Sequence, residues 1–143
     1  MKWVTREGAK TDRVACPWLI RRFIDKDAEF VFVPKDEVLE AARAAGGKSF
    51  DAAGADYTHR GPKCSFEVLI DDFKLGDPAL SRLAAIVHGA DVDDEPKPAP
   101  ESAGLLAMGL GFFETTRDDQ EKLRLQFPVY DALYAYCREA APR

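Results

Sequence analysis

Hydrophobic and polar positions in the first third of the chain form short apolar runs on either side of a longer apolar segment. Lys2–Thr5 and Glu29–Val33 (EFVFV) are rich in aromatic and β-branched residues and predict two strands. The apolar segment Trp18–Ile24 lies between them and predicts a helix. A strand, a helix and a second strand in this order favour a parallel crossover, so the pattern predicts an α/β or α+β domain.

The rest of the chain reads mainly as helices, preceded by two weaker strand signals. The expected elements are a helix over Asp36–Ala45 that stops at Gly46-Gly47, weak strands over Lys48–Asp51 and Ala55–Thr58, and helices over Phe66–Phe73, Asp77–His88 with Gly89 as the stop, Glu101–Glu114, and Asp118–Ala140 with a break before Pro128. The acidic, proline-rich stretch 91–100 predicts a solvated loop. We therefore expect a sheet of about three to four short strands in the first half, packed by five to six helices.

Composition narrows the class of protein. The chain has 143 residues, 46% hydrophobic and 31% charged, which fits one globular domain over residues 1–143. No apolar run approaches the roughly 18 residues of a spanning helix, and the start lacks a secretory signal, so we expect a cytoplasmic protein with no membrane partner. An odd cysteine count of 3 favours thiols over a disulfide framework.

Charge is unevenly distributed along the chain. The net charge is −5, yet residues 1–26 carry seven basic and three acidic side chains. An acidic protein is a poor partner for nucleic acid, so direct nucleic-acid binding is not expected. The basic start can still attract a small anion.

A first candidate site follows from Pro17. A helix that began at Asp12 would hold this proline in its interior at a cost of about 3 kcal/mol, so the pattern favours a start at Pro17 with Cys16 as the N-cap. The positive end of the helix dipole and nearby Arg13, Arg21 or Arg22 would then lower the pKa of the Cys16 thiol and create an oxyanion site.

The alternative for this stretch is structural. Cysteine is often a small buried hydrophobe, and Trp18 and Arg22, four residues apart, can stack as a cation–π pair with no role in chemistry.

A second candidate site lies at the turn around Gly61-Pro62. His59, Cys64 and Glu67 are competent ligands for a divalent transition metal such as zinc or iron, and Asp12 or Cys16 could complete the set. The structural alternatives are that Glu67 only stabilises the first turn of a helix and that His59 hydrogen-bonds a carbonyl. His59 is also the better candidate general base, because His88 is expected to interact with a helix C-terminus.

These stretches carry a family resemblance. The segments DRVACPWLIRRFID, EFVFVP, HRGPKCSFEVLI, LAAIVHGAD and VYDALYAYCRE together resemble the C-terminal domain family of the chromate-resistance protein ChrB over about residues 2–138. The resemblance implies a stress-response role in chromate resistance, through sensing or handling an oxyanion or a metal. It also implies a stand-alone form, without the N-terminal DNA-binding or rhodanese-like domain of many relatives, which again makes direct DNA binding unexpected.

Three functional hypotheses remain open. The first is a binding or sensing module whose oxyanion pocket is lined by the acidic, aromatic and basic residues of both stretches, namely Asp12, Arg13, Trp18, Arg21, Arg22, Arg60 and Lys63. The second is a metal- or thiol-dependent enzyme in which Cys16 and His59 are catalytic. The third is a partner-binding domain without chemistry, in which self-association is also conceivable. The first two require that the two stretches meet in one pocket.

Overall fold

The computed structural model describes residues 1–140, so the last three residues of the predicted domain, 141–143, lie outside the described part. Its sheet has three parallel strands in the order β2-β1-β3. The strands are β1 (Lys2–Arg6), β2 (Glu29–Val33) and β3 (Lys48–Ser49). Trp3 lies opposite Phe30 across β1 and β2. The first two strands and the parallel crossover are confirmed. The weaker pair shrinks to two residues of β3 and an isolated bridge between Phe50 and Tyr57.

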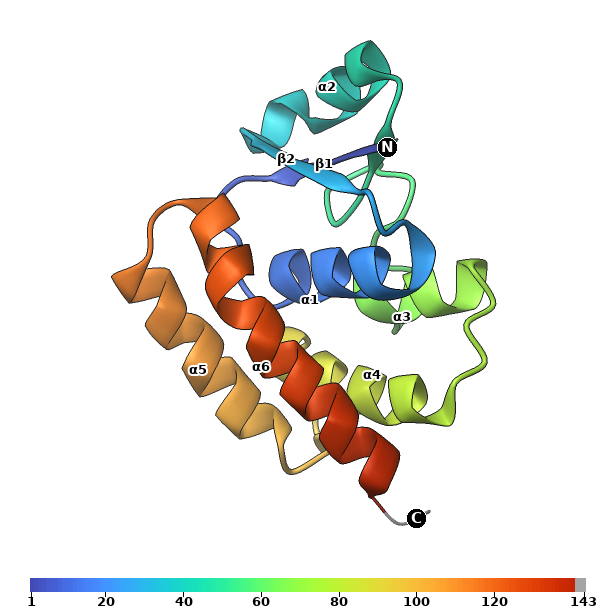
Figure 1. Ribbon diagram of the computed structural model, residues 1–143, viewed down its shortest axis with the longest axis vertical. Helices are drawn as coiled ribbons and strands as arrows, with labels where there is room; N and C mark the ends of the chain where they lie inside the picture. The colour runs from blue at the N-terminus through green and yellow to red at the C-terminus, as the bar shows by residue number, and fades with distance from the viewer. Residues whose placement is uncertain (141–143) are drawn as a thin grey trace.

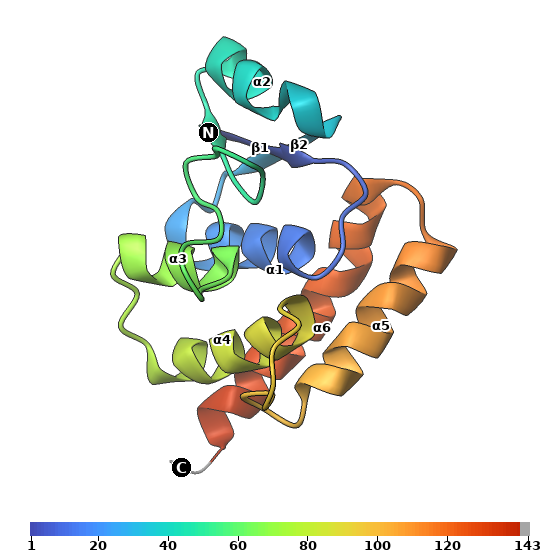
Figure 2. The same cartoon turned by 180° about the vertical axis from the view of Figure 1, so that it is seen from behind.

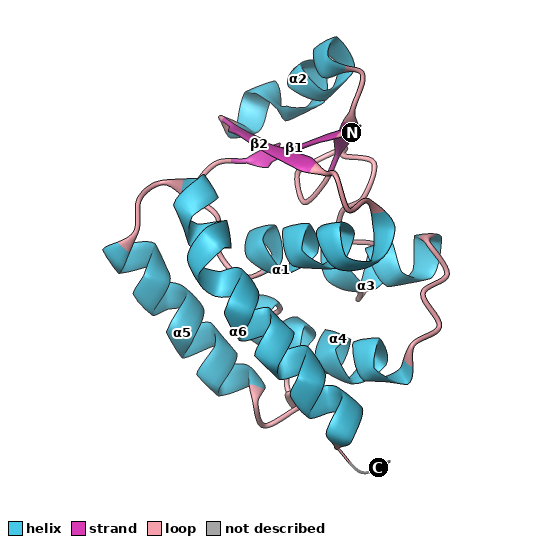
Figure 3. Ribbon diagram, viewed as in Figure 1, coloured by secondary structure: helices cyan, strands magenta, loops and turns pink. Residues whose placement is uncertain are grey.

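Helices make up most of the described residues. They are α1 (Asp12–Leu19), which continues into the π-helix η1 (Ile20–Ile24), the 3-10 helix η2 (Lys35–Glu37), α2 (Val38–Ala45), α3 (Ser65–Asp72), α4 (Pro78–Asp91), α5 (Ser102–Thr115) and α6 (Asp119–Glu139). The protein is therefore an α/β domain with a small sheet in its first half, as the sequence predicts (Figure 3). Among residues 1–140, no helix combines the length and apolar character that a bilayer crossing requires.

The elements stack in layers around α1. Helix α2 lies on one face of the sheet and α1 on the other, with α3, α4 and α6 packed beyond α1 and α5 at the outside (Figure 1). Seen from behind, the connection between α4 and α5 crosses the face turned to the viewer (Figure 2). Leu106 and Leu110 of α5 are exposed and would be available for contact with another molecule. Self-association stays a prediction.

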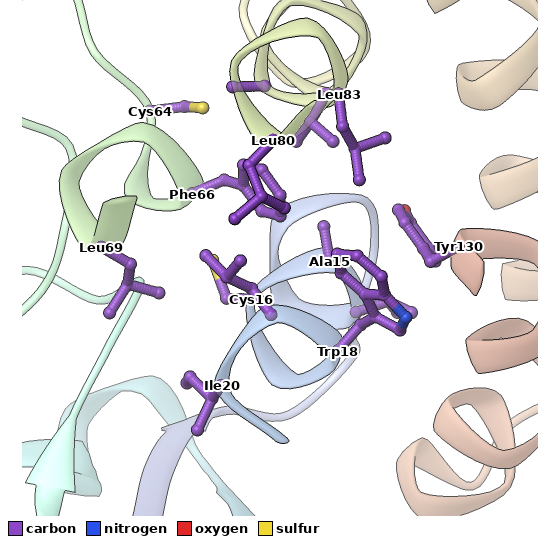
Figure 4. Packing of buried hydrophobic residues seen from close by; sticks show 14 of the residues in the cluster. Ala15, Cys16, Trp18, Ile20, Cys64, Phe66, Leu69, Leu80, Leu83 and Tyr130 are labelled. Carbon is purple, nitrogen blue, oxygen red and sulfur yellow. The ribbon is translucent and has the colours of Figure 1, made fainter. Parts of the chain in front are cut away.

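The core centres on α1, whose residues face the interior on nearly every side. Trp18, Leu19 and Cys16 are almost completely buried and pack against Phe66 of α3 and Tyr130 of α6 (Figure 4). All residues of α1 except Arg13 are buried, so the helix is enclosed by other elements. A smaller apolar cluster fills the space between the sheet and α2.

The start of α1 corrects the sequence prediction. The helix begins at Asp12, with Thr11 as its N-cap, and holds Pro17 in its interior. Proline has no N–H to donate to the carbonyl of Arg13, at a cost of about 3 kcal/mol. Burial of each large apolar side chain of this helix contributes about 1.5–3 kcal/mol, so Trp18 and Leu19 together more than offset that cost. The sequence prediction considered only the unfavourable effect of proline inside a helix and not the burial of the apolar side chains of α1.

Two further helix ends were also predicted wrongly. Helix α4 runs through Gly89 to Asp91, and α6 contains Pro128 without a break. At Gly89 the helix needs a residue without a side chain, because a Cβ there would lie 2.2 Å from Ser102 Oγ. Glycine at this position marks a close approach between α4 and α5 instead of a helix stop. By contrast, Gly46 does end α2, in the left-handed conformation expected at a C-cap.

Candidate metal centre

Asp12, the first residue of α1, is a buried carboxylate at the junction of α1 and α3. Only 2% of the residue is exposed. Its Oδ2 accepts a hydrogen bond of 3.0 Å from the backbone N–H of Ser65, the first residue of α3. Its Oδ1 has no hydrogen-bond partner among the described residues. Because a buried acceptor without a partner is rare and costs free energy, this oxygen needs an explanation.

His59 lies directly beside Asp12, on the loop that leads from β3 to α3. Its Nε2 is 3.5 Å from Asp12 Oδ2 and 3.1 Å from Oδ2 of Asp91, which ends α4. It is also 3.6 Å from Oδ1 of Asp51, which follows β3. Three carboxylates from separate parts of the fold therefore surround one imidazole.

Asp51 is held in place by its own partners. The Ser65 hydroxyl donates a hydrogen bond of 2.7 Å to Asp51 Oδ1, and the Arg13 guanidinium donates one of 3.2 Å to Oδ2. Asp51 also has a positive φ of 48°, a conformation that aspartate tolerates better than most residues. These two hydrogen bonds hold the Asp51 carboxylate in a fixed orientation beside His59.

The pKa values of Asp12, Asp91 and His59 in this cluster are shifted from their ordinary values. Burial raises the pKa of Asp12 well above its ordinary value, and the charges of Asp51 and Asp91 raise it further. Burial also raises the pKa of Asp91. The hydrogen bond to Asp12 raises the pKa of His59 to about 9, against the opposing effect of its partial burial. The cluster therefore places carboxylates where they repel one another and where a positive charge is favoured.

The arrangement suits a metal ion. One ligand atom each from Asp12, His59 and Asp91 lies within 4.8 Å of the other two. Carboxylate oxygens with one imidazole nitrogen are ligands for divalent ions such as Mn²⁺, Fe²⁺ and Zn²⁺. The half-exposed side chain of His59 leaves an open side to the cluster.

The metal ligands expected from the sequence do not form one group. His59 lies with Asp12, whereas Cys64 and Glu67 lie with a different histidine, His88. Cys64 is the N-cap of α3, and its backbone N–H donates to Glu67 Oε1 at 3.0 Å in a capping box. The structural reading of Glu67, as a residue that stabilises the first turn, therefore applies alongside any role as a ligand.

His88 also differs from expectation, because it does not cap a helix end. Its Nδ1 is 2.5 Å from Glu67 Oε1, and its Nε2 is 2.8 Å from Asp94 Oδ2 in the loop after α4. Burial lowers the pKa of His88, but the hydrogen bonds to Asp94 and Glu67 outweigh that effect and raise it overall. The side chain thus bridges two carboxylates.

Cys16 does not have the environment that was expected. It lies inside α1, completely buried, among Ile20, Phe66 and Leu69 (Figure 4). Burial raises the pKa of its thiol, and nearby carboxylates raise it further, so the predicted lowering is wrong. The structural alternative, a small buried hydrophobe, describes this residue.

The predicted oxyanion ligands do not converge either. Arg21 donates to the carbonyl of Ala28, and Arg22 forms a bidentate pair with Asp131. The remaining basic ligands each pair with a carboxylate: Arg13 with Asp51, Arg60 with Asp72, and Lys63 with Asp71. Each of these charges is thus already paired with a carboxylate, Arg13 largely inside the protein and Arg60 and Lys63 at its surface.

Trp18 is likewise engaged elsewhere. Its Nε1 donates a hydrogen bond of 2.7 Å to Asp131 Oδ1, the same carboxylate that Arg22 binds. The Arg22 guanidinium lies over the ring of Phe127, 5.6 Å from its centroid, and not over Trp18 as predicted. This group joins α1 and η1 to α6.

Sequence reasoning missed two members of the cluster, Asp51 and Asp91. Asp91 stands three residues after His88, a spacing that continues one face of a helix, but reading Gly89 as a stop removed it from consideration. Asp51 follows a strand of only two residues and is brought to His59 by pairing that no local pattern shows.

Comparison with known proteins identifies the relatives of this chain. The family model described as "ChrB, C-terminal domain" matches residues 3–137. The chain belongs to this family. It is 40% identical over 136 residues to Protein ChrB of Cupriavidus metallidurans, covering 94% of this chain and 40% of that relative. The chain thus spans well under half the length of that ChrB protein. No solved structure matches it significantly.

Proposed function

We propose that this chain acts in chromate resistance as a metal-binding domain, which holds a divalent transition metal ion with Asp12, His59 and Asp91. Asp51 would orient the site or supply a further oxygen. Membership of the ChrB C-terminal family supports the link to chromate resistance. The ligand chemistry of the cluster supports the metal.

The single observation that carries this proposal is the buried oxygen Asp12 Oδ1. It has no hydrogen-bond partner among the described residues, on a side chain whose other oxygen lies 3.5 Å from His59 Nε2. A bound cation would satisfy this oxygen and neutralise the repulsion between the carboxylates of Asp12 and Asp91. Without a metal ion, burial disfavours the ionised form of Asp12 and raises its pKa.

The same geometry argues against direct binding of chromate by the protein's own side chains. A dianion beside these carboxylates would be repelled. Three of the four arginines expected to receive it are paired with Asp51, Asp72 and Asp131, and Arg21 donates to the carbonyl of Ala28. A bound metal ion would supply the positive charge that these side chains do not offer. Sensing of an oxyanion would then depend on prior binding of the metal.

The test is metal binding by the purified chain after removal of metals. Mn²⁺, Fe²⁺ under exclusion of air, and Zn²⁺ are each titrated by calorimetry into wild type, His59→Ala and Asp91→Asn. We expect saturable binding in wild type. Each variant should lose more affinity at this site than the roughly 10- to 100-fold that removal of an outer partner costs. Chromate and sulfate are then titrated with and without the bound metal.

Asp93→Asn is the matched control, because Asp93 is close in sequence to Asp91 but fully exposed. It should bind metal as wild type does. Equal affinity in wild type, His59→Ala and Asp91→Asn would refute the proposal, as would an absence of binding in wild type. Chromate binding of equal strength in metal-free and metal-loaded protein would refute the dependence on metal.

A further inference from the structure

A second group of possible ligands lies at the start of α3 and the end of α4 and shares no residue with the Asp12 cluster. It consists of Cys64 at the start of α3, Glu67 one turn further along, and His88 in the last full turn of α4, with one ligand atom from each within 4.8 Å of the others. Glu67 Oε1 is 2.5 Å from His88 Nδ1. Cys64 is fully buried, whereas the side chains of Glu67 and His88 are 25% and 12% exposed. The group therefore runs from the interior to the surface.

The surface end of this group opens into a hollow of about 250 Å³. Ser81, Ala84, Ala85, Pro96 and Pro98 line it, together with Glu67 and His88. Small side chains at Ser81 and the two alanines of α4 leave the carboxylate and the imidazole accessible from outside. A ligand site needs such an access path, and His59 does not line this hollow.

Asp94 gives the imidazole a further support. Its Oδ2 is 2.8 Å from His88 Nε2, on the ring nitrogen that faces away from Glu67. A carboxylate behind a histidine in this way fixes the tautomer and the orientation of a ring whose other nitrogen binds metal. The loop after α4, which the sequence marks only as solvated, is thereby tied to the group.

The chemistry of this second group differs from that of the Asp12 cluster. A sulfur, an imidazole nitrogen and a carboxylate oxygen favour a thiophilic ion such as Zn²⁺, whereas two carboxylates and an imidazole accept harder ions. Three protein ligands also leave the fourth position of a tetrahedral ion free for water or an external ligand. Glu67 already has a second function in the capping box of α3, which holds it near Cys64.

We propose that Cys64, Glu67 and His88 form a second metal site, selective for zinc-like ions and separate from the Asp12 site. Helix α4 contributes to both groups, because His88 belongs to the second group and Asp91, three residues further along, belongs to the Asp12 cluster. This inference goes beyond the proposed function and does not depend on it. It gives the domain two cation sites of different softness that share no ligand.

Cobalt is the probe of choice, because a thiolate bound to Co²⁺ gives a charge-transfer band in the near ultraviolet. Metal-stripped protein is titrated with Co²⁺, followed by Zn²⁺ to displace it. We expect the band in wild type and in His59→Ala, and its loss in Cys64→Ser. Cys137→Ser is the matched control, since Cys137 is equally buried but belongs to α6, and it should keep the band.

Two variants cover the case in which Cys64→Ser fails to fold. Asp94→Asn alters an exposed outer partner, and we expect it to keep the band while weakening Co²⁺ binding about 10- to 100-fold. His88→Ala should abolish tight binding. The absence of a thiolate band in wild type, or its survival in folded Cys64→Ser or His88→Ala, would overturn the second site. Because His59→Ala leaves this band intact, failure here is distinguishable from failure at the Asp12 site.

Discussion

The close approach of α4 to α5 at Gly89 offers a direct test of the geometry that positions both ligand groups, since Gly89 lies between His88 and Asp91. The perturbation is Gly89→Ala. An alanine Cβ would lie 2.2 Å from Ser102 Oγ, 2.7 Å from Ser102 Cβ and 3.3 Å from Pro98 Cδ. The serine hydroxyl can rotate away, but its Cβ is fixed to the backbone of α5. The two helices must therefore move apart.

The magnitude follows from three opposing contributions. Alanine in place of glycine inside a helix contributes at most about 1 kcal/mol of stability. Rotation of Ser102 breaks the 2.8 Å hydrogen bond from its hydroxyl to the carbonyl of Ile86, which costs about 1 kcal/mol. Overpacking of a tight contact costs about 1–3 kcal/mol. We expect a net destabilisation of about 1–3 kcal/mol, or a melting temperature lower by roughly 3–10 °C.

The assay is urea unfolding at equilibrium and thermal unfolding of metal-free protein, with metal affinity measured separately. Gly111→Ala is the control, because Gly111 lies in α5 where an alanine Cβ would meet nothing within 4 Å, so this variant should gain stability. In a Ser102→Gly background the cost of Gly89→Ala should fall by at least about 0.5 kcal/mol. A Gly89→Ala protein as stable as wild type, or an effect unchanged by Ser102→Gly, would refute the close contact.

Two further predictions concern carboxylates. Burial raises the pKa of Asp12, so the fold disfavours an acid that is ionised in the unfolded chain at pH 7. Asparagine carries no such acid, so metal-free Asp12→Asn should be about 1–3 kcal/mol more stable than wild type at pH 7 and should lose stabilisation by added metal; a lower melting temperature would contradict this. The hydrogen bond from Arg22 lowers the pKa of Asp131, so ionised Asp131 adds stability above its unfolded pKa near 3.9, and this is lost as the pH falls through the folded value. Because Asp131 is half exposed, Asp131→Asn should cost less than about 1 kcal/mol at pH 7, and thermal melts should show that gap closing as the pH falls below the unfolded pKa near 3.9.

The sequence predicted the elements that depend on local rules. The strand Glu29–Val33 has the predicted bounds, and Asp77 caps α4 with Pro78 at its first position, as the dipeptide indicates. Gly46 ends α2 for the same kind of reason. In each case the backbone preference of one or two residues decides the outcome, and no distant contact opposes it.

Predictions failed where burial or contact between helices overrides a local preference. Pro17 stays inside α1 because that helix is enclosed on nearly every side. Gly89 stays inside α4 because Ser102 lies against it. A sequence shows that a proline or a glycine disfavours a helix, but it does not show how much apolar surface the same residues bury. These two errors displaced Cys16 to a false helix start and hid Asp91.

The division of these residues between two groups has a tertiary cause. His59 and Cys64 are five residues apart, and a local argument groups them, yet α3 begins just after Cys64 and the two side chains belong to different groups. Asp12 of α1 accepts from the N–H of Ser65 and lies beside His59, whereas Glu67 contacts His88 of α4. Contacts with α1 and α4, which lie far apart in sequence, thus separate residues that are close together along the chain.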